Sequence, residues 1–336
     1  MSEKVCIINA GGWGTALAIL LAGKGYDVAL WARRQELAER IARTRENPDY
    51  LPGVRVPDGV HPTASMEEAV GGSRVVLVPA ISGAMRELSL RLAPLVTPSM
   101  LIASGSKGLD PETLRRGTEL LEEALGGPHR GRVAAISGPN HAEEVSRGIP
   151  TATVVACRDK DVACALQSVL STPTFRVYTN PDVVGVELCG AVKNVVALAA
   201  GISDGLGYGD NAKAALITRS LAEIARLVSV MGGERATVAG LAGIGDLIAT
   251  CTSRHSRNRA AGEAIARGMS VDEVRAASPM VVEGIPATRA VLRLAREKGV
   301  EMPITTQVHA VLFEGISPQE GLARLMARGS TSEPWM

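Results

Sequence analysis

The sequence is poor in the residues on which several classes of protein depend. Aromatic residues make up only 3% of its 336 residues, too few for the stacking platforms with which single-strand nucleic-acid binders hold bases. Lys and Arg total 36 and Asp and Glu total 35, so the formal net charge is only +1. A chain so nearly neutral has no overall field to attract nucleic acid or an anionic membrane. We therefore expect neither nucleic acid nor integral membrane association.

Cysteine and histidine are few and scattered. The five cysteines contain no C-x-x-C pair, so neither a disulfide framework nor a zinc ribbon is expected. No two of the five histidines are four residues apart, and we expect no metal site. The N-terminus lacks a signal-peptide pattern, and apolar runs such as 16–22 and 195–200 are far shorter than the ~20 residues of a membrane span. These absences predict a soluble protein of a reducing compartment, most simply the cytoplasm.

The chain length points to two domains, because 336 residues exceed the ~250–300 at which a single core usually stops growing. A hydrophobic content of 46% is ample for two cores. The first half alternates short apolar runs with helical patterns, which indicates a parallel sheet covered on both faces. The predicted strands are residues 5–8, 27–31, 75–79, 101–104, 133–136, 151–157 and 175–179, with helices at 15–23 and 35–44 among those between them.

The character of the sequence changes near residue 180. Asn180-Pro181 is a typical helix start, with Asn as the cap and Pro at the first helical position. A long helical run from Asp182 to about Ala200 follows, and beyond it only helical patterns joined by glycine-rich loops occur. We predict an α/β domain of residues 1–186 and an all-α domain of residues 187–336, divided near Glu187.

A glycine-rich turn follows the first predicted strand. Gly11, Gly12, Trp13 and Gly14 lie between that strand and a helix, the context in which G-x-G-x-x-G binds a dinucleotide pyrophosphate at a helix N-terminus. Asn9 occupies the first glycine position, and Asn is the residue that best tolerates left-handed backbone after Gly. The alternative is a glycine turn of any α/β protein, but its context favours dinucleotide binding.

Two arginines follow the second strand. NAD-specific proteins usually place an acid there to hold the ribose 2′-OH, whereas this chain has Arg33 and Arg34. A guanidinium matches the oxygens of a 2′-phosphate, although two solvated arginines on a surface are also common. The position predicts that NADPH is preferred and that NADH remains possible.

Polar residues also follow two later strands. Lys107 lies in the loop after residues 101–104, and Gly138 and Asn140 follow residues 133–136. Ligands of open α/β sheets bind beyond the carboxyl ends of the strands. Each loop alone could be ordinary turn chemistry, but two at successive strand ends favour a substrate site.

The helix that begins the second half carries an unusual polar strip. Glu187, Gly190 and Asn194 are spaced to share one helical face among apolar neighbours, and Lys193 lies beside them. Apolar surroundings favour the uncharged form of a lysine, which suits a lysine that transfers protons. The alternative is a lysine that extends to the surface, normally the commoner arrangement.

A basic stretch later in the chain resembles a phosphate site. Residues 254–259 contain three arginines together with Ser256 and Asn258, and guanidinium and hydroxyl donors suit a phosphoryl dianion. Asp246 precedes this stretch, and residues 281–284 read as a loop near a cofactor. A solvated basic loop is the alternative.

These features together identify a resemblance. Over essentially its whole length the chain resembles the bacterial NAD(P)-dependent sn-glycerol-3-phosphate dehydrogenase family. The resemblance implies a Rossmann-type N-terminal domain, an all-helical C-terminal domain of the 6-phosphogluconate dehydrogenase C-terminal type, and often a homodimer. The residues that carry it are 9–16, 50–53, 106–108, 137–145, 187–201, 204–211, 214–219, 243–246, 256–258 and 281–284.

The resemblance also implies roles for individual residues. Lys193 corresponds to the proton-transferring lysine, Lys107 to a lysine that touches substrate and cofactor, and Asp246 to an acid of the substrate site. The implied substrate contacts are Lys107, Gly138, Asn140, Lys193, Asp246, Ser256, Arg257 and Asn258. The implied or predicted cofactor contacts are Gly11, Gly12, Trp13, Gly14, Arg33, Arg34, Tyr50, Lys107, Ala142, Arg257, Val281 and Glu283.

The activity expected from this resemblance is the reversible, NADPH-dependent reduction of dihydroxyacetone phosphate to sn-glycerol 3-phosphate, which supplies glycerophospholipid synthesis. Two rivals of the same class are a 3-hydroxyacid dehydrogenase and a 6-phosphogluconate dehydrogenase. A nucleotide sensor that has lost its chemistry would have no need of Lys107, Lys193 and Asp246. A methyltransferase also uses a glycine-rich turn but has no role for Arg33 and Arg34.

Overall fold

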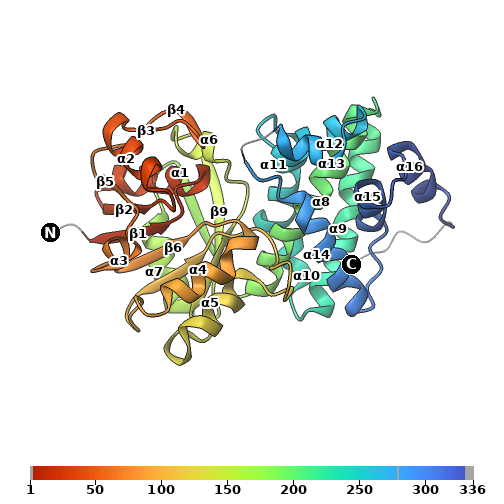
Figure 1. Cartoon of the computed structure of the whole chain (residues 1–336). Coiled ribbons are helices and arrows are strands. Elements are labelled where there is room, and N and C mark those ends of the chain that lie inside the picture. Colours follow the sequence, from red (N-terminus) through yellow and green to blue (C-terminus); the bar gives the residue numbers. More distant parts are fainter. Residues whose placement is uncertain (1–2, 278–279, 330–336) are drawn as a thin grey trace. The chain divides into compact units, whose positions relative to one another are not determined.

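The computed structural model describes residues 3–277 and 280–329, which form two compact units (Figure 1). The N-terminal unit contains the described residues up to Ser106 and then Arg115–Val183. The C-terminal unit contains Lys107–Leu114 and the residues from Val184 onward. The division therefore lies a few residues before the predicted Glu187. The short insertion carrying Lys107 was not predicted to leave the α/β domain.

The N-terminal unit is built on an eight-stranded sheet of order β10-β9-β8-β7-β6-β1-β2-β5. Neighbouring strands are parallel, as predicted, except that β8 and β9 pair antiparallel. The strand order reverses at β1, the point beside which open α/β sheets bind ligands. The strands of this sheet are β1 (Lys4–Ile8), β2 (Asp27–Trp31), β5 (Val60–Thr63), β6 (Val75–Val78), β7 (Leu101–Ser104), β8 (Val133–Ser137), β9 (Thr151–Ala156) and β10 (Phe175–Asn180).

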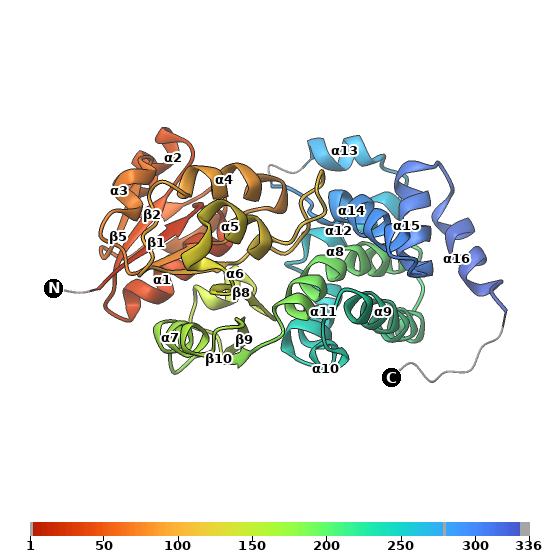
Figure 2. The same ribbon diagram turned by 90° about the horizontal axis from the view of Figure 1, so that it is seen from below.

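Helices cover both faces of this sheet because its strands are apolar on both sides. One core joins the sheet to α1, α2 and α7, and a second joins the opposite face to α3, α4 and α5. Figure 2 shows α4 and α5 on one side of the sheet and α7 on the other. The helices of this unit are α1 (Gly12–Gly23), α2 (Gln35–Thr44), α3 (Met66–Val70), α4 (Met85–Leu92), α5 (Gly117–Leu125), α6 (Ala142–Val145) and α7 (Lys160–Leu170).

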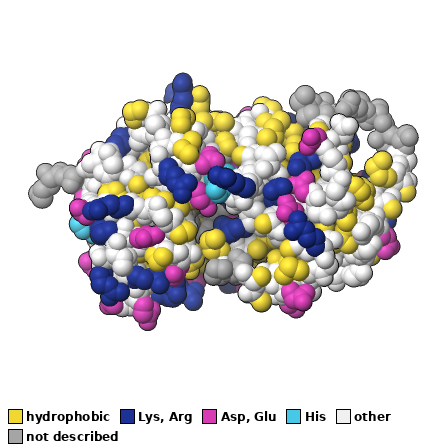
Figure 3. Space-filling model, turned by 90° about the horizontal axis from the view of Figure 1, so that it is seen from above, with side chains coloured by type: hydrophobic (Ala, Val, Ile, Leu, Met, Phe, Trp, Pro, Cys, Tyr) yellow, Lys and Arg dark blue, Asp and Glu magenta, His cyan; other side chains and the backbone are white. Residues whose placement is uncertain are grey.

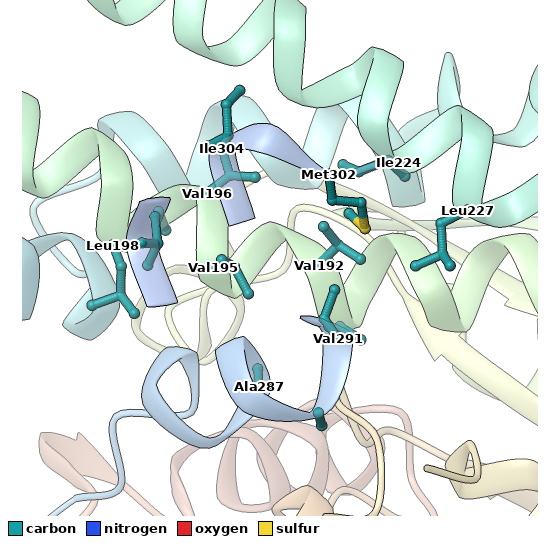
Figure 4. Close-up of a cluster of buried hydrophobic side chains, with 14 of the residues drawn as sticks. Val192, Val195, Val196, Leu198, Ile224, Leu227, Ala287, Val291, Met302 and Ile304 are labelled. Carbon is teal, nitrogen blue, oxygen red and sulfur yellow. The ribbon is translucent and has the colours of Figure 1, made fainter. Parts of the chain in front are cut away.

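The described part of the C-terminal unit is helical, as predicted. Its central helix α8 contributes Val192, Val195 and Val196 to a core shared with α9, α14 and α15 (Figure 4). Helix α8 is long and apolar enough to cross a membrane by length and composition, but 89% of its most apolar window is buried inside the protein. The helices of this unit are α8 (Val183–Gly205), α9 (Asp210–Val230), α10 (Arg235–Val238), α11 (Asp246–Thr252), α12 (Arg257–Ala266), α13 (Val271–Ala276), α14 (Gly284–Glu297), α15 (Pro303–Phe313) and α16 (Pro318–Met326).

Several local predictions need correction. Helix α1 begins at Gly12 rather than Thr15, because the glycines form its first turn. Asn180 does not cap α8 directly; it ends β10, and its Oδ1 accepts a hydrogen bond from the backbone N–H of Asp182. The sequence analysis also missed β5 and the small hairpin of β3 (Glu46–Asn47) and β4 (Leu51–Arg55). β3 has only two residues, and both β4 and β5 contain Pro, which is unfavourable in strands.

Candidate functional site

The glycine turn has the backbone geometry that dinucleotide binding requires. Asn9 adopts a positive φ of 104°, and its Nδ2 donates to the carbonyl of Pro79 at 3.2 Å. A Cβ at Gly14 would lie 2.0 Å from the carbonyl oxygen of Asn9, and a Cβ at Gly12 would lie 2.8 Å from that of Tyr50. Both positions therefore require glycine for close backbone packing.

The start of α1 is suited to an anionic ligand. Gly11 caps this helix and has no side chain to accept the N–H groups of the first turn, so these groups can bind phosphate oxygens. The indole Nε1 of Trp13 is buried and has no hydrogen-bond partner among the described residues. The residues present thus fit the pyrophosphate of a dinucleotide.

Arginines and an acid meet at the end of β2. Arg33 and Arg34 are exposed there, where a ribose lies in dinucleotide-binding sheets. Nη2 of Arg34 pairs with Oδ2 of Asp49 at 2.8 Å, and Arg40 pairs with the same oxygen. Hydrogen bonding to Asp49 is the main cause that raises the pKa of Arg34.

The polar residues that follow β8 also lie in the N-terminal unit. Gly138 has a φ of 145°, and a Cβ there would lie 3.0 Å from Cα of Thr153. The buried Asn140 donates from Nδ2 to Oγ1 of Thr153 at 3.1 Å, and Ala142 begins α6. Glycine at 138 thus lets the backbone pass close to β9, and Thr153 fixes the side chain of Asn140.

The predicted catalytic residues form a buried cluster in the C-terminal unit. Lys193 on α8 is 6% exposed and Asp246 at the start of α11 is 2% exposed. Nζ of Lys193 donates to Oδ1 of Asp246 at 2.5 Å, and Nζ of Lys107 donates to Oδ2 of the same carboxylate at 2.9 Å. One carboxylate therefore holds two ammonium groups. The alternative that Lys193 extends to the surface is wrong.

Electrostatics within this cluster favour proton transfer. Burial lowers the pKa of Lys193 to about 8, with Asp246 opposing the shift and Lys107 adding to it. For Asp246, burial acts to raise the pKa, but the two lysines outweigh burial and hold it below the usual range. Asp246 thus stays ionised while Lys193 titrates near pH 8.

Thr250, which the sequence reading missed, completes the surroundings of Lys193. Its Oγ1 accepts from Nζ of Lys193 at 2.8 Å and donates to the carbonyl of Asp246 at 2.6 Å. Thr250 lies four residues after Asp246 on α11, so both share one helical face; this i,i+4 spacing is a signal that could have found it. An ammonium has three N–H donors, and Asp246 and Thr250 take two, which leaves one for a substrate oxygen.

Buried amides connect the lysine cluster to its surroundings. Nδ2 of Asn194 donates to the carbonyl of Lys107 at 2.8 Å, and Oδ1 of Asn194 accepts from Nδ2 of Asn258 at 2.9 Å. Oδ1 of Asn258 accepts from the backbone N–H of Gly284 at 2.8 Å. This chain of amides fixes the backbone of Lys107 on the C-terminal unit and leaves one N–H of Asn258 for another acceptor.

The arginines of the basic stretch 254–259 have different partners. Arg257 donates from Nη1 to the carbonyl of Val281 at 3.0 Å, so the predicted cofactor loop lies against it. Arg259 instead pairs with Asp204 at 2.7 Å and with Glu263 at 2.8 Å. Oγ of Ser256 accepts the N–H of Arg259 as the cap of α12. Because acids hold Arg259, Arg257 is a better candidate than Arg259 for a phosphate.

The structure brings most of the predicted residues together within each unit. In the C-terminal unit these are Lys107, Lys193, Asp246 and Asn258, and Arg257 with Val281. Glu283 lies at the N-cap position of α14. In the N-terminal unit Gly11, Gly12, Trp13 and Gly14 form the start of α1, with Tyr50 against Gly12. No group of three or more His, Cys, Asp and Glu side chains suited to a metal occurs among the described residues.

Comparisons with known proteins point to the same family along nearly the whole chain. Residues 4–163 match the family model described as the NAD-dependent glycerol-3-phosphate dehydrogenase N-terminus, and residues 182–323 match the model of its C-terminus. The chain is 50% identical over 334 residues to "Glycerol-3-phosphate dehydrogenase [NAD(P)+]" of Moorella thermoacetica, covering 99% of this chain and 98% of that protein. A crystal structure of glycerol-3-phosphate dehydrogenase from Coxiella burnetii matches with a TM-score of 0.93 and 41% identity, covering 97% of this chain and 99% of that one. A structure of glycerol-3-phosphate dehydrogenase from Saccharomyces cerevisiae matches with a TM-score of 0.81 and 26% identity, covering 96% of this chain and 99% of that one.

Proposed function

The chain belongs to the NAD-dependent glycerol-3-phosphate dehydrogenase family, and on that premise we propose that it reversibly reduces dihydroxyacetone phosphate to sn-glycerol 3-phosphate with NADPH. The observation that carries this proposal is the buried cluster in which Asp246 holds both Lys193 and Lys107. A buried lysine with a pKa of about 8 is suited to exchange a proton with an oxygen.

The N-terminal unit binds the cofactor, which supplies or accepts the hydride at C2 of the substrate. The first turn of α1, from Gly11 to Gly14, binds the pyrophosphate through backbone N–H groups. Arg33 and Arg34 bind the 2′-phosphate and give NADPH its preference over NADH. The remaining proposed cofactor contacts are Tyr50, Lys107, Ala142, Arg257, Val281 and Glu283.

Lys193 donates and accepts the proton of the reaction. When the ketone at C2 is reduced, its oxygen gains a proton from the ammonium of Lys193, and in the oxidative direction the amine of Lys193 takes that proton from the C2 hydroxyl. Asp246 and Thr250 orient Nζ and leave one N–H for that oxygen. Lys107 places a second positive charge beside the substrate oxygens, where it stabilises developing negative charge.

The phosphate of the substrate is anchored away from the reacting carbon. Arg257 supplies a guanidinium, and the unused N–H of Asn258 and the hydroxyl of Ser256 supply further donors, with Gly138 and Asn140 completing the proposed contacts. Anchoring fixes C2 relative to Nζ of Lys193, and such positioning accounts for a large share of enzymatic rate enhancement.

The same family membership supports a proposal for the setting of this activity. We propose that the enzyme works in the cytoplasm as a homodimer, without nucleic acid or integral membrane association, and that its product supplies glycerophospholipid synthesis. Basic and acidic side chains are interspersed on the face shown in Figure 3, which agrees with a protein whose ligands are small molecules.

The test is an assay with NADPH and dihydroxyacetone phosphate. Consumption of NADPH is measured as the decrease in its absorbance. A 3-hydroxyacid and 6-phosphogluconate, assayed in the oxidative direction, test the two rival dehydrogenases. Lys193→Ala should lower kcat by about 10²–10⁴-fold, because a positioned general acid contributes on this order, with an unchanged circular dichroism spectrum. Lys298→Ala is the matched control, since Lys298 is exposed at the end of α14. Turnover of Lys193→Ala near that of wild type would remove Lys193 from the mechanism.

A further inference from the structure

A segment of the N-terminal unit joins the glycine turn to the arginines that follow β2. The fully buried Asn47 donates from Nδ2 to the carbonyl of Ala10 at 2.9 Å and to Oγ1 of Thr15 at 2.7 Å. Three residues later, the carbonyl of Tyr50 lies against Gly12. Because Asp49 lies between these anchors, its backbone is held in a fixed position relative to the pyrophosphate-binding turn.

The carboxylate of Asp49 is used on one side only. Its Oδ2 pairs with Arg34 at 2.8 Å and with Arg40. Its Oδ1 accepts no hydrogen bond from any residue that the structure describes. The side chain is 29% exposed, so part of it is accessible to a ligand. The two arginines also keep the pKa of Asp49 below its usual range against the opposing effect of burial, so the carboxylate is ionised at neutral pH.

Resting on the proposed function, we propose that Asp49 limits the preference for NADPH by accepting a hydrogen bond from the ribose 2′-OH of NADH. The acid that NAD-specific sheets carry at the end of the second strand is replaced here by Arg33 and Arg34. A carboxylate is nevertheless present beside Arg34, because Asp49, which lies later in the sequence, pairs with it. The two cofactors thus use different partners: the 2′-OH uses Asp49 and the 2′-phosphate uses the arginines.

This arrangement predicts opposite effects on the two cofactors when the charge of Asp49 is removed. A carboxylate repels a 2′-phosphate at short range but accepts strongly from a hydroxyl, and hydrogen bonds to charged groups are stronger than neutral ones. Asp49→Asn should therefore weaken NADH binding by about tenfold and leave NADPH binding unchanged or stronger. If Asp49 served only to hold Arg34 for the phosphate, the same substitution would weaken NADPH instead.

The experiment measures dissociation constants of NADH and NADPH by fluorescence titration for the wild type and Asp49→Asn. Competition by ADP and by adenosine 2′,5′-bisphosphate, which lack nicotinamide, reports the ribose site without any reaction. Asp58→Asn is the matched control, because Asp58 also lies between two arginines, Arg45 and Arg55, but is 84% exposed. Thermal melting checks that each variant folds.

Three outcomes decide the proposal. A rise in the ratio of the NADH to the NADPH dissociation constant in Asp49→Asn alone supports it. A fall in that ratio, or equal weakening of both cofactors, overturns it. Failure of the proposed function is separate: a wild-type protein that binds both cofactors but leaves dihydroxyacetone phosphate unreduced contradicts the reaction and leaves the cofactor result standing.

Discussion

At the scale of single residues, the proposed chemistry rests on one carboxylate shared by two lysines. Lys193 alone in an apolar helix would lose its proton well below its usual pKa, and Asp246 limits that loss. The balance leaves Lys193 able to change its charge near pH 8. Without Asp246, a smaller fraction of Lys193 would be protonated at neutral pH, and a fully exposed lysine would have almost none of the unprotonated amine that the oxidative direction needs.

The pH dependence of the two directions should follow this balance. Lys193 is protonated below its pKa of about 8, so kcat/KM for reduction of dihydroxyacetone phosphate should be level below that pH and fall above it. Oxidation of sn-glycerol 3-phosphate needs the unprotonated amine, so its kcat/KM should rise to a plateau above the same pH. Steady-state kinetics from pH 6 to 10 measure both profiles. A reduction rate that stays level through pH 10 would contradict the assignment.

At the scale of elements, the parts of the fold most evident from sequence are those defined by local pattern. Strands such as β2 and β7 and helix α2 begin and end where the apolar patterns predict. The antiparallel pairing of β8 with β9 and the position of β5 beside β2 depend on contacts distant in sequence, which no local pattern encodes. Lys107–Leu114 belongs to the C-terminal unit for the same reason: its contacts there are distant in sequence, so no local pattern predicted them.

The candidate site divides in the same way. Lys193 and the glycine turn carry local signals: a charge in an apolar helix, and a turn between strand and helix. Asp246 was assigned a role only through the family resemblance. The partners Asn47 and Asp49 carried no local signal, because they lie in an irregular segment that only tertiary folding brings to Ala10 and Arg34. Arg259 is the opposite case, because its local sequence indicated a phosphate ligand. In the structure it pairs instead with Asp204, which is distant in sequence.

Two glycines on the same helix, α1, test the role of the turn. Gly14→Ala would place a Cβ 2.0 Å from the carbonyl of Asn9, so it should displace the turn, lower the melting temperature and weaken NADPH binding at least about tenfold, by analogy with overpacking costs of ~1–3 kcal/mol. Gly23→Ala meets no atom within 4 Å and should stabilise the protein by up to ~1 kcal/mol without changing binding. Thermal melts and fluorescence titration compare the pair. Equal behaviour of both variants would show that the turn tolerates a side chain.

At the scale of the whole molecule, the net charge of +1 conceals where charge is used. The lysines and arginines that we propose as phosphate ligands are balanced by acids elsewhere, and one of these acids lies in the helical core. Glu223 on α9 is 4% exposed and caps the start of α15, accepting from the N–H groups of Ile304 at 2.6 Å and Thr305 at 3.3 Å. Burial raises its pKa to about 7 despite these hydrogen bonds.

This buried acid should make the stability of the whole protein depend on pH. The pKa of Glu223 is raised from 4.5 to about 7 in the folded state, so between those values the folded protein binds more protons than the unfolded chain. Stability from this group is therefore greatest below pH 4.5 and is lost as the pH rises to 7. Glu223→Gln removes this titration while keeping an oxygen to accept from Ile304. The free energy of unfolding of the variant relative to wild type should then increase from pH 5 to pH 7, as measured by urea denaturation.

The exposed Glu273 provides the control for this titration. It caps α13 from its third residue, and hydrogen bonds to Ser270 lower its pKa. Its ionised form is thus favoured by folding, so Glu273→Gln should lose stability relative to wild type as the pH rises through the acidic range, the opposite sign. Subtracting wild-type values at each pH removes the contributions of all other groups, because only one carboxylate differs. If the two variants showed the same pH dependence, the cap of α15 by Glu223 would not be the origin of the effect.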